Sequence, residues 1–154
     1  MNKYRLILTI ICLIIIIPSL LSQEKEISQD KKSMNELKQL YLENKQTRPF
    51  LAMEYAAQAL QIAESLNDSS EIATFYNYLG DSYFSKKSYS MAMDNYFKSY
   101  LIFQRLNDQK NVAYSYLDIG AVYFEQNLSS IAYGYFIKAR DIFESTNDKE
   151  GLSH

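Results

Sequence analysis

Few side chains in this 154-residue sequence are suited to covalent or metal chemistry. The one histidine is His154 and the one cysteine is Cys12, and they lie at opposite ends of the chain. A Ser-His-Asp or Cys-His arrangement needs such residues together, and so does a zinc cluster. The four glycines are isolated, so the sequence lacks a glycine-rich phosphate loop. We therefore expect no enzyme activity, no cofactor and no metal site.

The carboxylates have the spacing of exposed helix surfaces, where charged residues are usually found. Examples are Glu24, Glu26, Glu36, Glu64, Asp94, Asp141 and Glu144. The net charge is −2 at pH 7. Because a mildly acidic chain is repelled by phosphate backbones, we expect no nucleic-acid binding by this segment.

Residues 1–22 have the layout of a secretory signal peptide. Lys3 and Arg5 precede an apolar run over residues 6–17, Pro18 ends the run, and small or polar residues follow. We therefore predict export to the periplasm or the extracellular space. The alternative is an uncleaved anchor, which would tether the protein to a membrane. The run is shorter than the roughly 20 residues that a spanning helix needs, which favours cleavage.

An internal repeat of 40 residues accounts for most of the remaining sequence. The pair Asn-Asp recurs at 67–68, 107–108 and 147–148. Aligned without a gap, residues 73–110 and 113–150 are identical at 12 of 38 positions, where chance would give about two or three. Apolar residues spaced by three or four predict two helices in each repeat, with a short polar break between them.

These features divide the chain into six segments. We predict a signal peptide (1–22), a linker (23–32), a degenerate first repeat (33–68), a second repeat (69–108), a third repeat (109–148) and the start of a truncated fourth repeat (149–154). Because solenoids normally end in a polar capping helix, we expect the uncapped C-terminal face to promote self-association. We also expect this chain to be a fragment or a naturally shortened protein.

Within the repeats, aromatic, aliphatic, glycine and alanine residues have a recurring spacing. In the second repeat these residues are Tyr76, Leu79, Gly80, Tyr83, Ala92 and Tyr96. In the third they are Tyr116, Ile119, Gly120, Tyr123, Ala132 and Phe136. The spacing resembles the tetratricopeptide repeat (TPR) signature. The period of 40 instead of 34 and the missing terminal proline resemble the longer TPR variants. HEAT repeats, which also run at about 40 residues, lack this spacing.

The resemblance implies an all-α fold, a right-handed superhelical solenoid of antiparallel helix pairs with about three repeats. Gly80 and Ala92 lack bulk, so the two helices of a repeat can approach closely. It also implies a protein or peptide ligand in a concave groove lined by the first helix of each repeat.

By the same resemblance, ten positions face that groove. They are Thr74, Asn77, Asp81, Phe84, Ser85, Tyr114, Leu117, Ala121, Phe124 and Glu125. The amide of Asn77 can donate to and accept from a peptide backbone. Phe84 and Phe124 either hold apolar side chains of the ligand or pack within the array. Asp81 and Glu125 make the groove acidic, which favours a basic or neutral, partly apolar peptide.

Two functions follow from this organisation. The first is an exported scaffold for protein–protein or peptide binding. The alternative is the N-terminal sensor part of a bacterial membrane signalling protein, a histidine kinase or a transcription regulator, whose effector domain lies beyond residue 154. The two share the predicted fold, and the alternative makes the groove an input site for signal transduction.

Overall fold

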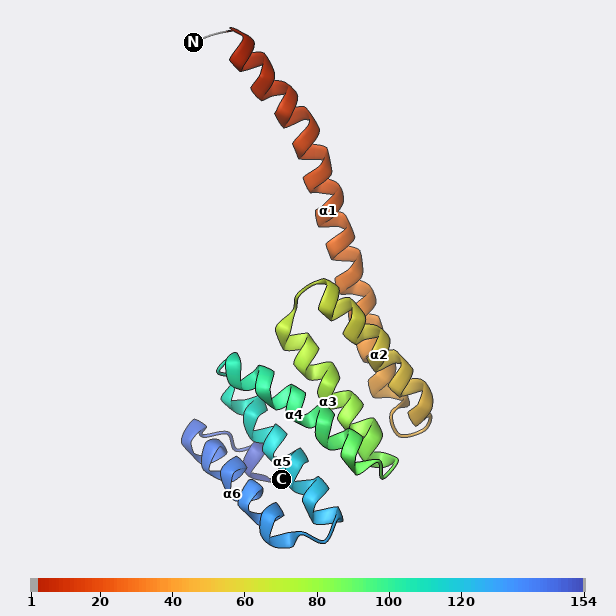
Figure 1. Ribbon diagram of the computed structural model, residues 1–154, viewed down its shortest axis with the longest axis vertical. Coiled ribbons are helices and arrows are strands. Elements are labelled where there is room, and N and C mark those ends of the chain that lie inside the picture. Colours follow the sequence, from red (N-terminus) through yellow and green to blue (C-terminus); the bar gives the residue numbers. More distant parts are fainter. Residues whose placement is uncertain (1–2, 154) are drawn as a thin grey trace.

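The computed structural model describes the backbone of residues 3–153 and the side chains of residues 19–152. Over this range the chain forms helices and turns without any strand, so the predicted all-α class is confirmed. The elements are α1 (Lys3–Asn44), α2 (Pro49–Ser65), α3 (Ser69–Ser85), α4 (Tyr89–Arg105), α5 (Gln109–Glu125), α6 (Ser129–Thr146) and the short 3-10 helix η1 (Gly151–Ser153). Figure 1 shows them as successive helical hairpins.

The 40-residue period of the sequence is also the period of the backbone. Helices α3 and α5 begin 40 residues apart, at Ser69 and Gln109, and so do α4 and α6. Before α3 and α5, the carboxylates of Asp68 and Asp108 accept a hydrogen bond from the backbone N–H three residues later, at 3.2 and 3.1 Å. Such a side-chain cap stabilises a helix start by about 1 kcal/mol, so the Asn-Asp pairs mark where each repeat begins.

The turns between the helices depend on a left-handed backbone conformation. It is adopted by Asn67, Lys87, Asn107, Asn127 and Asn147, with φ between 53° and 63°. Asparagine tolerates this region better than most residues because its short polar side chain can bond locally. Lys87 is the exception, at the position that Asn127 takes in the third repeat.

The two helices of a repeat pack closely because a glycine faces an aromatic ring. An added Cβ at Gly80 of α3 would lie 2.5 Å from two ring carbons of Tyr96 in α4. At Gly120 of α5 it would lie 2.5 Å from a ring carbon of Phe136 in α6. Protein interiors are close-packed, so neither position has room for a larger residue. This explains why both repeats keep a helix-weakening glycine.

In the first repeat the residue sizes at these two positions are exchanged. Leu40 stands at the glycine position and Ala56 at the aromatic position. Ala56 is fully buried. The neighbouring Tyr41 is also buried and stacks on Tyr78 of α3, with ring centroids 4.2 Å apart. The repeat that is degenerate in sequence therefore still forms a helix pair, α1 with α2.

The helix pairs form a continuous row. Besides the pairs α1–α2, α3–α4 and α5–α6, extensive contacts join α2 to α3 and α4 to α5. Residues 69–108 and 109–148, the predicted second and third repeats, coincide with α3–α4 and α5–α6. The packing is that of a helical repeat, as Figure 1 illustrates.

Helix α1 extends well beyond the repeat (Figure 1). The predicted linker, residues 23–32, continues this helix and is almost entirely exposed. Its glutamate, glutamine and lysine residues favour a helix, and it lacks glycine and proline. The predicted signal peptide falls mostly on residues 1–18, whose side chains lie outside the described part of the chain. Within the described part, no helix combines the length and apolar character needed to cross a membrane.

Candidate peptide-binding groove

Four of the predicted groove residues come together between α3 and α5. Thr74, Asn77, Asp81 and Tyr114 line a cavity of about 280 Å³. The other lining residues are Tyr78, Phe103, Asn111, Ser115 and Asp118. We call this cavity the α3–α5 groove. Its walls carry amide, hydroxyl and carboxylate groups, which can bond to a peptide backbone and to a basic side chain.

Two carboxylates are held in place by neighbouring donors. The amide Nδ2 of Asn77 donates to Oδ2 of Asp118 at 2.6 Å, across the gap between α3 and α5. The hydroxyl of Tyr96, whose ring covers Gly80, donates to Oδ1 of Asp81 at 2.9 Å. One N–H of Asn77 is thus engaged by the protein, and a ligand would use its second N–H and its carbonyl oxygen.

Burial changes the protonation of this site. It raises the pKa of Asp118 to about 7, and the nearby charge of Asp81 acts in the same direction, against the hydrogen bond from Asn77. Burial also raises the pKa of Asp81, against hydrogen bonds from Tyr96 and Tyr41 and the charge of Lys45. Asp118 is therefore near the midpoint of its titration at neutral pH. A cation placed beside it would favour the ionised form.

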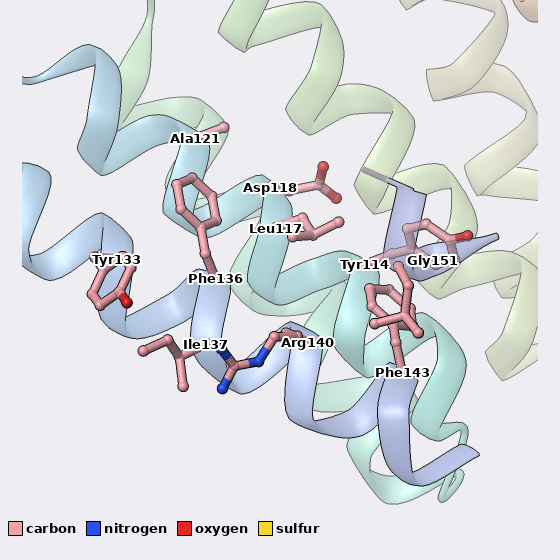
Figure 2. Close-up of a pocket in the computed structure, with 11 residues that line it drawn as sticks. Tyr114, Leu117, Asp118, Ala121, Tyr133, Phe136, Ile137, Arg140, Phe143 and Gly151 are labelled. Carbon is pink, nitrogen blue, oxygen red and sulfur yellow. The ribbon is translucent and has the colours of Figure 1, made fainter. Parts of the chain in front are cut away.

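A second cavity, of about 710 Å³, adjoins the groove on the α5–α6 side (Figure 2). Two further predicted residues, Leu117 and Ala121, line it together with Tyr114 and Asp118. Helix α6 and the segment after it supply the rest of the lining, Tyr133, Phe136, Ile137, Arg140, Phe143, Gly151 and Leu152. This cavity is largely apolar and shares Tyr114 and Asp118 with the α3–α5 groove.

The two predicted phenylalanines have different surroundings. Phe84 is half-buried, lies 5.9 Å from the ring of Tyr89, and packs against the core cluster around Ala92 and Tyr96. It therefore acts as a packing residue, although it also borders a smaller cavity of about 190 Å³ with Asp81 and Ser85. Phe124 is 58 % exposed, as expected of a residue that could contact a ligand.

Glu125 does not contribute to the acidity of the groove. It lies at the end of α5, where its carboxylate accepts a hydrogen bond from the Tyr89 hydroxyl at 3.3 Å. Asp118 supplies the second carboxylate instead, beside Asp81. Asp118 is not among the predicted groove residues, and the matching position of the second repeat is Tyr78, which is not acidic. The available signal was an acid within the otherwise apolar helix face of Leu117 and Ala121.

Among the residues whose side chains are described, no group of three or more histidine, cysteine, aspartate or glutamate residues could hold a metal ion. No family model matches the sequence, and comparisons with curated proteins and with solved structures also gave no match.

Proposed function

We propose that this chain is a TPR-type solenoid scaffold that binds a peptide segment of a partner protein in the α3–α5 groove. The observation that carries the proposal is the set of donors and acceptors lining one cavity, among them Asn77, Asp81 and Asp118. In a right-handed superhelix of such helix pairs, this surface would be the concave one. We also propose export, on the residue pattern of the first 22 residues.

The ligand that suits this groove is a basic, partly apolar peptide. Asp81 and Asp118 attract a lysine or arginine side chain, and Asn77 can pair with the peptide backbone. The adjoining surface of Leu117, Ala121 and Phe136 accepts an apolar side chain next to it. Hydrogen bonds from Asn77 to the peptide backbone would supply affinity that does not depend on the peptide sequence. The carboxylates and the apolar surface would therefore determine which peptide is bound.

The experiment is a binding measurement on a peptide array. We would probe nonapeptides that combine lysine or glutamate with leucine or serine. Wild-type protein should retain peptides containing both lysine and leucine, and Asn77→Ala should weaken this binding by about tenfold, the effect of losing roughly 1.4 kcal/mol. Asp94→Asn, a change on an exposed face of α4, is the control and should leave binding unchanged.

The same array should show a dependence on pH. Asp118 is protonated below a pKa of about 7 and ionised above it, so lysine peptides should bind more tightly at pH 8 than at pH 6. Asp118→Asn should remove this difference. If wild-type protein retains no peptide, or if it and Asn77→Ala bind the same peptides equally, the groove has no role in peptide binding.

A further inference from the structure

Charge is distributed unevenly between the two edges of the row of helices. The turns within the helix pairs, residues 45–51, 85–91 and 125–131, lie along one edge, and the turns that follow each pair lie along the other (Figure 1). We call the first of these the hairpin edge. It carries four basic residues and a single acid, Glu125, although the whole chain has a net charge of −2. The basic residues are Lys45, Arg48, Lys86 and Lys87.

Most of this positive charge is unpaired. None of the four basic residues forms an ion pair within the described part of the chain. Lys45 shares the 190 Å³ cavity with Asp81, which balances part of its charge. Arg48 and Lys87 are exposed to solvent. The hairpin edge can therefore attract an anionic partner.

Exposed apolar side chains accompany these basic residues. Phe50 is 69 % exposed, and the ammonium of Lys86 lies 3.7 Å from the centre of its ring. Met91 of the second hairpin turn and Leu128 and Ile131 of the third are also exposed. None of these apolar residues lines the three cavities described above. Exposed apolar residues gathered in this way mark a surface that contacts another protein or a membrane.

We propose that the hairpin edge binds the surface of an anionic lipid bilayer. Basic residues are attracted to acidic headgroups, and apolar side chains beside them enter the boundary between headgroups and acyl chains. Three turns can all meet a flat surface at once, since three points always lie in one plane. Where Phe50 enters this boundary, the ammonium of Lys86 beside its ring can reach a phosphate. This site goes beyond the proposed groove function because it involves neither Asn77 nor Asp118.

The shape of the hairpin edge favours a bilayer over a peptide or a partner helix. Such a partner is usually held in a concave groove that encloses its anchoring side chains. The exposed apolar residues of this edge come from separate turns, and none of the three cavities joins them. A bilayer needs no such groove, because its headgroups are mobile and can rearrange around each side chain.

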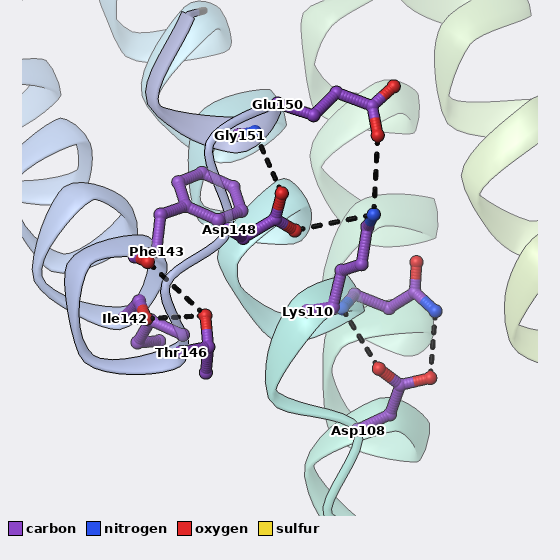
Figure 3. Close-up of polar contacts among 9 residues, drawn as sticks. Asp108, Lys110, Ile142, Phe143, Thr146, Asp148, Glu150 and Gly151 are labelled. Atoms are coloured by element: carbon purple, nitrogen blue, oxygen red, sulfur yellow. Dashed lines mark hydrogen bonds and ion pairs between the residues drawn. The ribbon is translucent and has the colours of Figure 1, made fainter.

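A second copy of this chain is a poor occupant, because its acids are already engaged. The turns that follow each helix pair form the opposite edge, residues 65–71, 105–111 and 145–151. Each of the five acids on this edge has a partner within the chain. Lys110 pairs with Asp148 at 3.3 Å and with Glu150 at 3.4 Å (Figure 3). The other three are Asp68 and Asp108, which accept helix-capping hydrogen bonds, and Glu71, which pairs with Lys38.

The exposed part of α1 gives a second copy no better match. Residues 23–32 contain three acids and three lysines, so this segment carries no net charge. An anionic bilayer, in contrast, presents negative charge over a whole surface.

The test places an environment-sensitive dye on each edge of the full chain with Cys12→Ser. One protein carries the dye at Leu128→Cys on the hairpin edge, and the other carries it at Leu106→Cys on the opposite edge. The two leucines are matched, since they are 44 and 45 % exposed. The dye reports its own surroundings, so the comparison holds whether or not residues 6–17 also contact lipid.

The vesicles contain phosphatidylcholine, with or without anionic phosphatidylglycerol. On the anionic vesicles, emission of the dye at position 128 should shift to the blue and be quenched by spin-labelled lipid. The dye at position 106 should show neither change. On vesicles of phosphatidylcholine alone, the response at position 128 should be at least about tenfold weaker, because the basic residues lack acidic headgroups.

Charge variants test which residues carry the contact. Arg48→Gln combined with Lys87→Gln should abolish most of the quenching at position 128 at a fixed lipid concentration, because together they contribute about 25-fold to surface affinity. Lys149→Gln, at an exposed lysine of the opposite edge, is the matched control and should leave the quenching unchanged. Asn77→Ala should also leave it unchanged, which separates this site from the groove.

Several outcomes would overturn the proposal. One is the absence of a response at position 128 on anionic vesicles, and another is an equal response at positions 128 and 106. A response that is as strong on neutral vesicles, or that survives the loss of Arg48 and Lys87, would show that the basic residues do not bind the bilayer. A dye at position 128 that responds to polyglutamate or to protein concentration, but not to vesicles, would make an acidic protein or a second copy the partner.

Discussion

The second and third repeats have the same backbone but different chemistry on the surface that lines the cavities. At three aligned positions the polar residues of the second repeat are replaced by apolar ones. The pairs are Asn77 and Leu117, Asp81 and Ala121, and Tyr96 and Phe136. The acid at position 81 and the hydroxyl that donates to it disappear together, so the apolar version leaves no buried carboxylate without its donor. The packing positions set the shape of a repeat, and these three positions set the polarity of the surface beside it.

The largest expected effect comes from a feature that both repeats share. Gly120→Ala should destabilise the fold by about 2 to 3 kcal/mol, because the added Cβ meets the ring of Phe136 and overpacks the core. Gly80→Ala should act in the same way through Tyr96. Gly134→Ala is the control. Its Cβ meets open space within 4 Å, so it should stabilise the helix by about 0.5 to 1 kcal/mol. Urea unfolding followed by circular dichroism measures all three, and a shift of the same sign for Gly120 and Gly134 would contradict the packing argument.

A smaller effect should come from converting the polar pair Asp81 and Tyr96 of the second repeat into the apolar residue types that the third repeat has at these positions, alanine and phenylalanine. Tyr96→Phe alone removes the hydrogen bond to the partly buried Asp81 and should destabilise by about 1 to 2 kcal/mol. Adding Asp81→Ala should recover about 1 kcal/mol, because the carboxylate that lost its donor is gone. Tyr133→Phe, at a 64 % exposed position, controls for loss of a hydroxyl. Strictly additive free energies of unfolding in this double-mutant cycle would mean that the pair is not coupled.

The smallest effect should come from the turn between the two helices of a repeat. Lys87 has φ of 58° where the third repeat has Asn127. Lys87→Asn should stabilise the protein by about 0.5 kcal/mol, because asparagine tolerates the left-handed region better. Asn127→Lys should destabilise it by a similar amount. Thermal unfolding of both variants checks this, and equal melting temperatures for the two would show that the turns do not distinguish these residues.

The sequence was sufficient to predict features that recur at a fixed spacing. The 40-residue alignment predicted the helix pairs, and the glycine at positions 80 and 120 indicated close packing because glycine weakens a helix unless a neighbour requires it. Some of the predicted groove positions lie together. Thr74, Asn77, Asp81 and Tyr114 do line one cavity, since positions that repeat along one helix face point the same way.

Other parts of the site depend on contacts that differ between the second and third repeats. Asp118 has no acidic counterpart in the second repeat, and its bond to Asn77 joins helices 41 residues apart in the sequence. Phe84 and Phe124 are identical in an alignment, yet the first packs against Tyr89 whereas the second is exposed. Whether each ring is packed or exposed depends on its neighbours, and those neighbours differ between the repeats. Helical structure over residues 23–32 likewise depends on composition, without an apolar face that a periodicity search would detect.

The order in which the helices touch has a consequence for how the chain folds. The extensive contacts all join helices that are neighbours in the sequence, from α1–α2 to α5–α6. Because only short loops separate the helices that touch, little conformational entropy is lost when each helix–helix contact forms. Folding rates rise as the mean sequence separation of contacting residues falls. Folding can therefore nucleate in a single hairpin, such as α3–α4 with its glycine–tyrosine contact, and spread outward to both sides one helix at a time.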